Sequence, residues 1–248
     1  APLLSFMFQY GGVVSVDVVE ASGSQTSRKD LLILRNLRDG VKKLRLLDIK
    51  VGQVTAQAGW QGKSRIRAAK QAVIDGHTNS QAEGFRLEGF DGVPPALASM
   101  DPLMDLRLGP SKKTDRLARK AMRIMFQRLT ACEIFIHFLD LHQEPADPGD
   151  AELSSVMAPV ELAEIVLHEI VVRLIRLAVA CRRAPVPQKW LGSSVALGFD
   201  AGELPARAAG AEQELRKKTL VHIFDWGRSE LNTLEKYNGL TEGERQDR

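Results

Sequence analysis

Cysteine is scarce in this sequence, which has only Cys132 and Cys181 among its 248 residues. Both lie in apolar stretches with helical spacing, so we expect two reduced core residues rather than a disulfide. So few cysteines are typical of reducing compartments. We therefore predict an intracellular protein, cytoplasmic or nuclear, and the first apolar stretch, residues 3–10, lacks the basic leader of a signal peptide.

The sequence also lacks a long apolar run without charge. Its most hydrophobic stretch, residues 160–180, contains five charged side chains: Glu161, Glu164, Glu169, Arg173 and Arg176. This density of charge argues against a transmembrane helix. We predict a buried amphipathic helix instead.

The common catalytic signatures are missing as well. The sequence has no Gly-x-x-x-x-Gly-Lys-Ser/Thr, no Gly-x-Gly-x-x-Gly, no Gly-x-Ser-x-Gly and no Cys-x-x-Cys, which removes the protein classes that these motifs define. The net charge of +3 is close to neutral, but basic residues cluster at 63–70 and 107–128, so we expect anionic ligands. Nucleic acid is the weaker choice, because Phe126 is the only aromatic residue in the second cluster.

The order of the predicted elements indicates an α+β architecture with a small β-rich N-terminal part. We expect strands at 6–10 and 13–19, joined by a turn at Gly11 and Gly12, and another strand at 31–34. A connector at 35–43 leads to a strand at 46–52. A helix at 62–76, with an apolar stripe through Ile66, Ala69 and Val73, and a strand at 85–90 follow. Two long helices are expected at 114–142 and 159–183. Strands at 190–199 and 220–226 flank a short helix at 211–218, and the polar tail at 232–248 favours partial disorder.

The strand at 46–52 alternates between apolar and polar side chains. Leu47 and Ile49 would face the core, which places Asp48 and Lys50 side by side on the opposite face. A carboxylate and an ammonium group presented together, with Gly52 following, make a polar site that a ligand can approach closely. The alternative is an exposed ion pair of Asp48 and Lys50, which adds little stability.

Several motifs follow one another in a fixed order along the chain. Residues 44–52 read Leu-Arg-Leu-Leu-Asp-Ile-Lys-Val-Gly, residues 84–86 read Gly-Phe-Arg, residues 192–196 read Gly-Ser-Ser-Val-Ala, and residues 223–226 read Ile-Phe-Asp-Trp. The linker at 34–37 reads Leu-Arg-Asn-Leu. In this order, over residues 31–233, they resemble the signatures of the inositol polyphosphate kinase family, although Leu44 stands where the family signature begins with proline.

The resemblance implies a two-lobed, protein-kinase-like α+β fold. It divides the chain into a reduced β-rich N-terminal lobe with a hinge at 1–36, a catalytic lobe at 37–233 and a polar tail at 234–248. It also implies a kinase that uses ATP and Mg²⁺ to phosphorylate a hydroxyl or phosphate of an inositol polyphosphate.

The resemblance also implies the roles of the site residues. Asp225 would bind the metal, and Lys50 would contact the transferring phosphoryl group or the inositol phosphate. Asp48 would either hold the ribose or orient the acceptor hydroxyl. The other candidates are Leu34, Asn36, Leu37 and Ser194 for the nucleotide, and Lys63, Arg67 and Lys70 for the substrate. A solvated helix face is the alternative for these three basic residues, and a structural role is the alternative for Arg86.

The N-terminal lobe departs from the family. Members carry a lysine for the nucleotide phosphates on a strand of that lobe, whereas this chain has only Lys29, in the polar loop predicted at 21–29. Either Lys29 serves, or a lysine upstream of Ala1 does, or nucleotide binding is impaired. The last possibility motivates a second hypothesis, a catalytically weak or inactive relative that binds inositol phosphates or phosphoinositides as a regulatory module.

Overall fold

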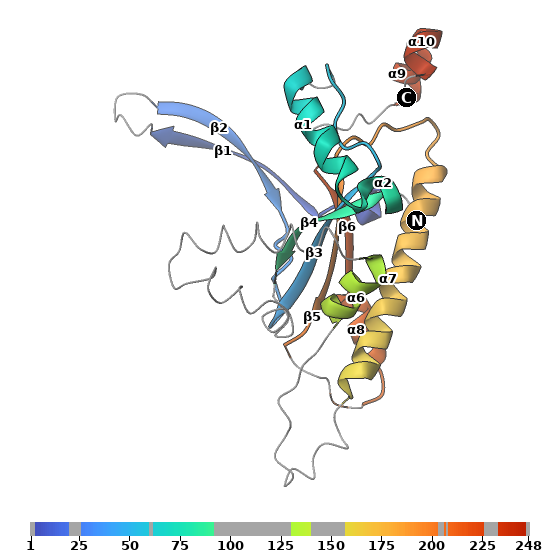
Figure 1. Ribbon diagram of the computed structural model, residues 1–248. Helices are drawn as coiled ribbons and strands as arrows, with labels where there is room; N and C mark the ends of the chain where they lie inside the picture. The colour runs from blue at the N-terminus through green and yellow to red at the C-terminus, as the bar shows by residue number, and fades with distance from the viewer. Residues whose placement is uncertain are drawn as a thin grey trace, which may run out of the picture.

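A four-stranded antiparallel sheet lies at the centre of the molecule (Figure 1). The structure is a computed structural model that describes residues 3–19, 26–59, 62–91, 130–139, 157–202, 206, 208–225 and 233–246. The sheet has the order β4-β3-β5-β6, with strands β3 (Leu44–Val51), β4 (Phe85–Asp91), β5 (Ser194–Asp200) and β6 (Leu220–Phe224). The strands expected at 46–52, 85–90, 190–199 and 220–226 are therefore confirmed, although their ends shift by up to four residues.

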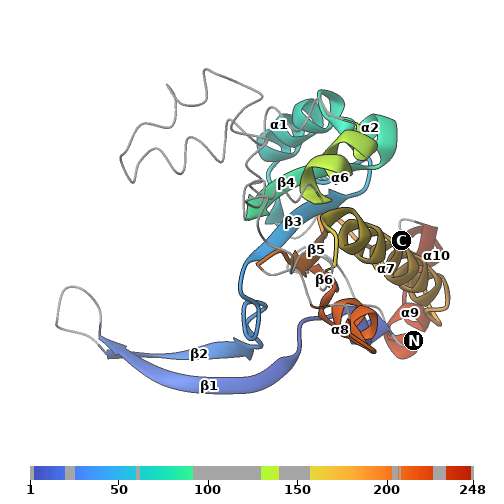
Figure 2. The same ribbon diagram turned by 90° about the horizontal axis from the view of Figure 1, so that it is seen from below.

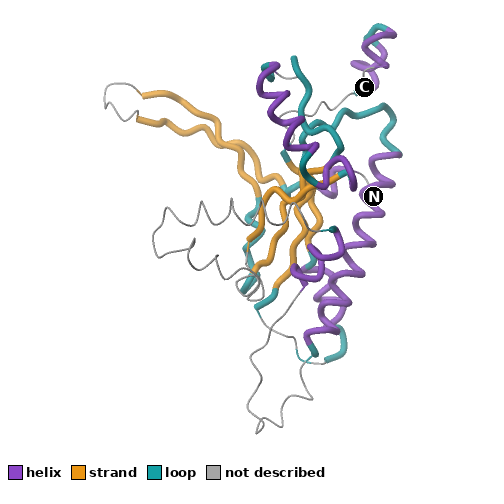
Figure 3. Tube along the Cα trace, viewed as in Figure 1, coloured by secondary structure: helices purple, strands orange, loops and turns teal. Residues whose placement is uncertain are grey.

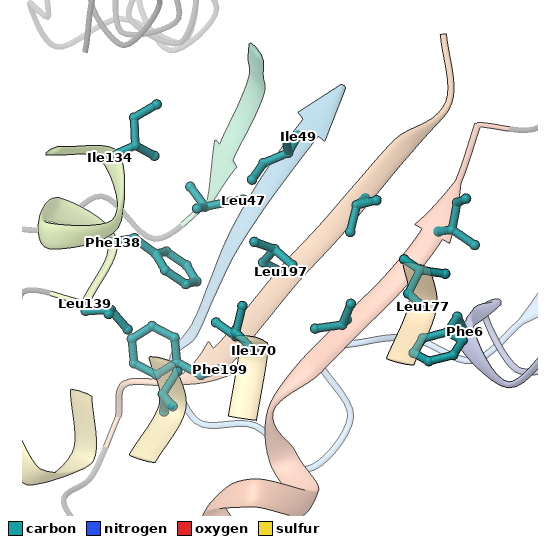
Figure 4. Close-up of a cluster of buried hydrophobic side chains, with 14 of the residues drawn as sticks. Phe6, Leu47, Ile49, Ile134, Phe138, Leu139, Ile170, Leu177, Leu197 and Phe199 are labelled. Carbon is teal, nitrogen blue, oxygen red and sulfur yellow. The ribbon is translucent and has the colours of Figure 1, made fainter. Parts of the chain in front are cut away.

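One face of this sheet forms the hydrophobic core. Leu47 and Ile49 of β3 are buried there with Leu197 and Phe199 of β5. Figure 4 shows these side chains pointing toward Phe138 and its neighbours on two helices, α6 (Ala131–Leu139) and α7 (Pro159–Arg182). Because side chains alternate along a strand, burial of this face leaves Asp48 and Lys50 on the other one.

The helix α7 runs along the sheet as one continuous element of 24 residues (Figures 1 and 3). Pro159 suits its first turn, where a backbone N–H would have no partner in the helix. Leu162, Val166 and Ile170, spaced four residues apart, are buried against the core. The predicted amphipathic helix is confirmed, and none of the helices in the described ranges is both long enough and apolar enough to span a membrane.

Two helices, α1 (Arg65–Gly76) and α2 (Asn79–Glu83), connect β3 to β4. The hydroxyl of Ser64 accepts a hydrogen bond from the backbone N–H of Arg67 and so caps the start of α1. The predicted inward stripe is wrong, because Ile66 and Val73 are 70% and 61% exposed. The buried positions of α1 are instead Ala68 and Asp75, so a carboxylate faces the protein.

The N-terminal strands form a separate hairpin that extends away from the central sheet (Figures 1 and 2). After the 3₁₀ helix η1 (Leu3–Phe6), β1 (Tyr10–Val19) pairs antiparallel with β2 (Thr26–Leu34). The expected turn at Gly11 and Gly12 is wrong, because both glycines lie within β1, where the register shifts. Phe6 belongs to η1 rather than to a strand, and the strand predicted at 31–34 is the end of β2.

Lys29 lies on β2 opposite Val16 and is exposed, rather than in a loop. This corrects the prediction of a polar loop for residues 26–29, which belong to β2, and places the lysine on a strand of the N-terminal hairpin. The rest of that predicted loop lies outside the described residues.

The remaining predictions have mixed outcomes. The helix α8 (Ala211–Lys218) forms as expected, whereas the tail contains two short helices, α9 (Leu234–Asn238) and α10 (Glu242–Gln246), in place of the expected disorder. Within the helix predicted at 114–142, Thr130 is not helical and α6 begins at Ala131. The rest of that helix and the basic cluster at 107–128 lie outside the described residues. Both cysteines are free, but Cys132 is exposed and does not belong to the core.

Asp200, at the end of β5, fixes the connector that precedes β3. Its carboxylate accepts hydrogen bonds from the backbone N–H groups of Lys42 (3.0 Å), Lys43 (2.9 Å) and Gly202 (3.0 Å). Burial would raise the pKa of Asp200, but these three donors outweigh it and lower the pKa below its ordinary value. The ionised carboxylate is therefore the form that holds the connector.

We expect Asp200→Asn, which mimics the protonated acid, to lower the free energy of unfolding at pH 7 by about 1–3 kcal/mol, because charged hydrogen bonds are lost. A carboxyl group with a lowered folded-state pKa stabilises the protein above its unfolded pKa, and this contribution disappears as the pH falls through the folded value. The difference between wild type and variant, measured by urea unfolding, should therefore shrink below about pH 4. Asp39→Asn, an exposed change in the same connector, is the control, and an equal effect of both variants would contradict the assignment.

Candidate functional site

The face of the sheet opposite the core carries a row of polar side chains. Lys50 of β3 lies directly between Arg86 of β4 and Ser194 of β5 in the strand register. Residues opposite one another in antiparallel strands project to the same face, and so does Asp48, two residues before Lys50. The predicted juxtaposition of Asp48 and Lys50 is thus what the sheet provides, and Ser194 joins them from β5.

The ammonium group of Lys50 is held by two oxygen atoms. Its Nζ donates a hydrogen bond to the carbonyl oxygen of Gly192 (3.1 Å) and lies 3.5 Å from Oδ2 of Asp225. The Lys50 side chain is only 12% exposed, whereas that of Asp225 is 55% exposed. Such a half-exposed ion pair adds little stability, but it orients the ammonium group and leaves the Asp225 carboxylate accessible to a ligand.

Asp225 directly follows β6 and has a backbone φ of 62°. This left-handed conformation is uncommon outside glycine, although aspartate tolerates it better than most residues. It turns the chain at the end of the strand. The tertiary structure therefore brings together Asp225, Lys50 and Asp48, which are far apart in the sequence.

Asp48 is the most unusual group of the site. Burial raises its pKa, the neighbouring Ser194 hydroxyl and Lys50 ammonium oppose that effect, and the carboxylates of Glu88 and Asp225 add to it. Within the described residues, neither the buried Oδ1 of Asp48 nor the Oγ of Ser194 has a hydrogen-bond partner of acceptable geometry. Buried polar atoms without partners cost stability and are concentrated at functional sites.

Two residues of the site escape the sequence analysis. The register between β3 and β4 shifts so that Glu88 is an extra residue in β4, a bulge next to Asp48, and no sequence signal marks it. Gly192 has a φ of 69°, and a Cβ there would lie 2.7 Å from the backbone oxygen of Thr55. Only glycine therefore allows the Gly192 carbonyl to approach Lys50, a requirement that the Gly-Ser-Ser motif could have suggested.

The candidate nucleotide residues of the hinge lie apart from this row. Leu34 ends β2 and is exposed, while Asn36 and Leu37 lie in the turn that follows. The Asn36 side chain accepts a hydrogen bond from the backbone N–H of Arg38 (3.0 Å). Its side chain thus shapes the turn, a sufficient reason for an asparagine at this position.

The candidate substrate residues lie on and before α1. Arg67 and Lys70 are exposed neighbours on the helix surface. Lys63 precedes the capping residue Ser64, so it lies outside the helix, and the common helix face predicted for all three basic residues is wrong for Lys63.

No group of three or more histidine, cysteine, aspartate or glutamate side chains is arranged to hold a metal ion in the described part of the chain. Mg²⁺ is commonly bound by one or two carboxylates together with phosphate oxygens and water. The accessible carboxylate of Asp225 beside Lys50 fits that mode of binding.

The architecture is an α+β, two-lobed, kinase-like fold, and a solved structure supports this fold. The chain is similar to the inositol phosphate multikinase Ipk2 from S. cerevisiae in complex with ADP and Mn²⁺, with a TM-score of 0.61 and 16% identity over 94% of this chain and 82% of that chain. Another inositol phosphate multikinase structure matches with a TM-score of 0.46 and 16% identity over 92% and 79% of the two chains. No protein-family model and no curated protein matches the sequence. The fold predicted from the motif resemblance is therefore confirmed as that of the inositol polyphosphate kinases.

The unusual environment of Asp48 gives a testable consequence. Asp48→Asn keeps the shape of the side chain but removes a charge that burial disfavours, so we expect the free energy of unfolding at pH 7 to stay equal or rise by about 1 kcal/mol. Because the pKa of Asp48 is higher in the folded state, ionisation of this group destabilises wild type once the pH rises above the pKa of an unfolded aspartate, about 4. The variant's gain in free energy of unfolding over wild type should therefore develop as the pH is raised from about 4 to 7, and it should vanish at lower pH.

Urea unfolding across this pH range measures the effect. Asp225→Asn is the matched control, because its carboxylate is exposed and paired with Lys50, and it should give no gain. A clear loss of stability in Asp48→Asn at pH 7 would contradict the assigned environment.

Proposed function

We propose that the chain is a kinase that transfers the γ-phosphoryl group of ATP to a hydroxyl group of an inositol polyphosphate, with Mg²⁺ as cofactor. The observation that carries the proposal is the contact of Lys50 with Asp225 beside the buried Asp48, on one face of a sheet with the Ipk2-like fold. Phosphoryl transfer requires positioned cations and a metal-binding carboxylate more than covalent chemistry by the protein. Lys50 and Asp225 supply these two groups.

Each side chain then has a defined role. The acceptor hydroxyl oxygen forms a bond to the γ-phosphorus while the bond from that phosphorus to the bridging β,γ-oxygen breaks, and ADP leaves. Lys50 neutralises charge on the transferring group, and Asp225 would hold Mg²⁺, which would supply positive charge at the phosphates. Ser194 lies at the nucleotide phosphates, and Arg67 and Lys70 of α1 bind substrate phosphates.

Asp48 has an unsatisfied buried oxygen beside Lys50, which suits an O–H donor next to the transferring phosphoryl group. Of the two roles open to it, we propose orientation of the acceptor hydroxyl and acceptance of its proton, rather than contact with the ribose. On this view Asp48→Asn binds Mg-ADP as tightly as wild type but loses turnover. A weakened Mg-ADP affinity would favour the ribose role.

The direct test is incubation with Mg-ATP and a panel of inositol phosphates. We expect wild type to phosphorylate at least one of them and Lys50→Ala to lose about 10²- to 10³-fold in kcat, because a transition-state cation is removed. Lys217→Ala changes an exposed lysine of α8 that pairs with Glu214 and should retain full activity. Absence of turnover by wild type on every member of the panel would overturn the kinase proposal.

We also propose that Lys29 contacts the nucleotide phosphates from β2, with nucleotide bound between the lobes at 1–36 and 37–233. Lys29→Met should then raise KM for ATP by about tenfold, the effect of a lost charged contact, and leave KM for the inositol phosphate unchanged. Arg28→Met is the matched control, because adjacent strand residues point to opposite faces of the hairpin. Equal effects of the two variants on KM for ATP would argue against Lys29.

One observation favours a second candidate function. The N-terminal part described here is a two-stranded hairpin with exposed apolar residues, including Leu32 and Ile33, and a single hairpin is a weak platform for a nucleotide. A binding module without kinase activity would be stabilised thermally by the inositol phosphate alone. A kinase would also be stabilised by Mg-ATP, so thermal unfolding with each ligand separates the two.

A further inference from the structure

A buried cluster next to the proposed site joins four segments of the chain. The guanidinium group of Arg86 on β4 contacts the carboxylate of Asp75 near the end of α1, and the two side chains are 1% and 5% exposed. Its Nη1 also donates to the hydroxyl groups of Thr55 (3.1 Å) and Ser80 (3.3 Å), and its Nε donates to Glu88 (3.1 Å). Arg86 therefore ties the loop after β3, both α1 and α2, and the β4 bulge to one point.

The Asp75 side of the cluster holds the loop after β3 through several hydrogen bonds. Asp75 accepts hydrogen bonds from the backbone N–H of Thr55 (2.9 Å) and from its hydroxyl (2.7 Å and 3.0 Å to the two carboxylate oxygens). Gln71, one helical turn earlier on α1, donates to the same carboxylate (3.3 Å). Thr55 itself is 1% exposed, so its backbone is fixed between α1 and the sheet.

This cluster leads directly to Lys50. The backbone oxygen of Thr55 lies so close to Gly192 that no side chain fits there, and the carbonyl of Gly192 accepts the hydrogen bond from Lys50. Lys50 is also the direct neighbour of Arg86 across the β3–β4 pair. A displacement of Arg86 or Asp75 would thus move the group that orients the Lys50 ammonium.

The position of α1 depends on the same cluster. Its large apolar residues Ile66 and Val73 face solvent, and the buried residues are Ala68 and Asp75. Apolar burial is non-directional, whereas a charge-assisted hydrogen bond between a guanidinium and a carboxylate group depends on both distance and angle. The helix lies beside α2 and β4 (Figure 2), and its orientation is set largely by the directional contacts of Asp75.

We infer that Arg86 and Asp75 are positioning residues that set the spacing between Lys50 and the basic residues Arg67 and Lys70 of α1. The inference rests on the proposed function, in which Lys50 acts on the transferred phosphoryl group and α1 binds the substrate phosphates. Stability alone does not require this arrangement, because a buried ion pair is often replaceable by apolar residues without loss. Its value here is the fixed geometry between two groups of cations that bind one polyanion.

The test compares Arg86→Lys with Arg45→Lys. Lysine keeps the charge but lacks the planar guanidinium group, whose Nη1 contacts Asp75, Thr55 and Ser80 while its Nε donates to Glu88. Arg45 is an equally buried arginine of β3 on the core side, where it donates to the carbonyl oxygen of Phe138 (3.0 Å). It controls for the general cost of altering a buried arginine.

We expect Arg86→Lys to lower kcat/KM for the inositol phosphate by about 10- to 100-fold, mainly through KM, because a displacement of about 1 Å has effects of this size. KM for ATP should stay within about twofold, since α1 lies on the substrate side of the proposed site. Arg45→Lys should change neither KM, and any loss in its rate should match its folded fraction. Asp75→Asn should reproduce the KM pattern of Arg86→Lys.

Hydrogen–deuterium exchange gives a readout that does not depend on turnover. In Arg86→Lys we expect faster amide exchange in residues 53–56 and in α1, with unchanged protection in α7 and β6. Uniform loosening, or a KM pattern equal to that of Arg45→Lys, would overturn the inference. If wild type phosphorylates no inositol phosphate, the proposed function fails by itself, and the exchange pattern alone then decides whether Arg86 positions α1 and the Thr55 loop.

Discussion

Burial of one face of β3 is the constraint on which the rest of this site depends. Leu47 and Ile49 are locked against α6 and α7, and a shift of one residue in register would turn every side chain of the strand to the wrong face. The register is therefore strongly determined. The placement of Asp48 and Lys50 on the opposite face follows from this register, because successive side chains of a strand alternate between its two faces.

The opposite face shows how a protein holds several charges close together. Lys50, Asp225 and Asp48 partly compensate one another, while Arg86 is neutralised by Asp75 and Glu88 in an almost fully buried cluster. The compensation is incomplete at Asp48, whose pKa is raised and whose buried Oδ1 has no hydrogen-bond partner among the described residues. Asp48 thus lowers the stability of the fold, while the charged groups around it are held in place by hydrogen bonds and ion pairs. This pattern is expected at a site where a bound ligand completes the interactions of the carboxylate.

The N-terminal hairpin and helix α1 share a feature that separates them from the core. Both present large apolar side chains to solvent, among them Leu32 on β2 and Ile66 on α1, and a carboxylate makes directional hydrogen bonds next to each. The connector of the hairpin depends on Asp200, and α1 depends on Asp75. Under the proposed function, these are the two elements that would contact nucleotide and substrate.

The sequence by itself determined the central strands and helices α7 and α8, and it supplied Asp48, Lys50, Ser194 and Asp225 as candidate site residues, because alternation, helical spacing and motif order are local properties. It gave the wrong inward face for α1, since Asp75 is buried only through its pairing with Arg86, a residue on another element. It also misplaced the hairpin turn, because the Gly11-Gly12 pair is compatible with both a turn and a strand. Only the tertiary structure decided the bulge at Glu88, the close approach of Gly192 to Thr55 and the contact of Lys50 with Asp225, since each depends on which distant segments the buried sheet brings together.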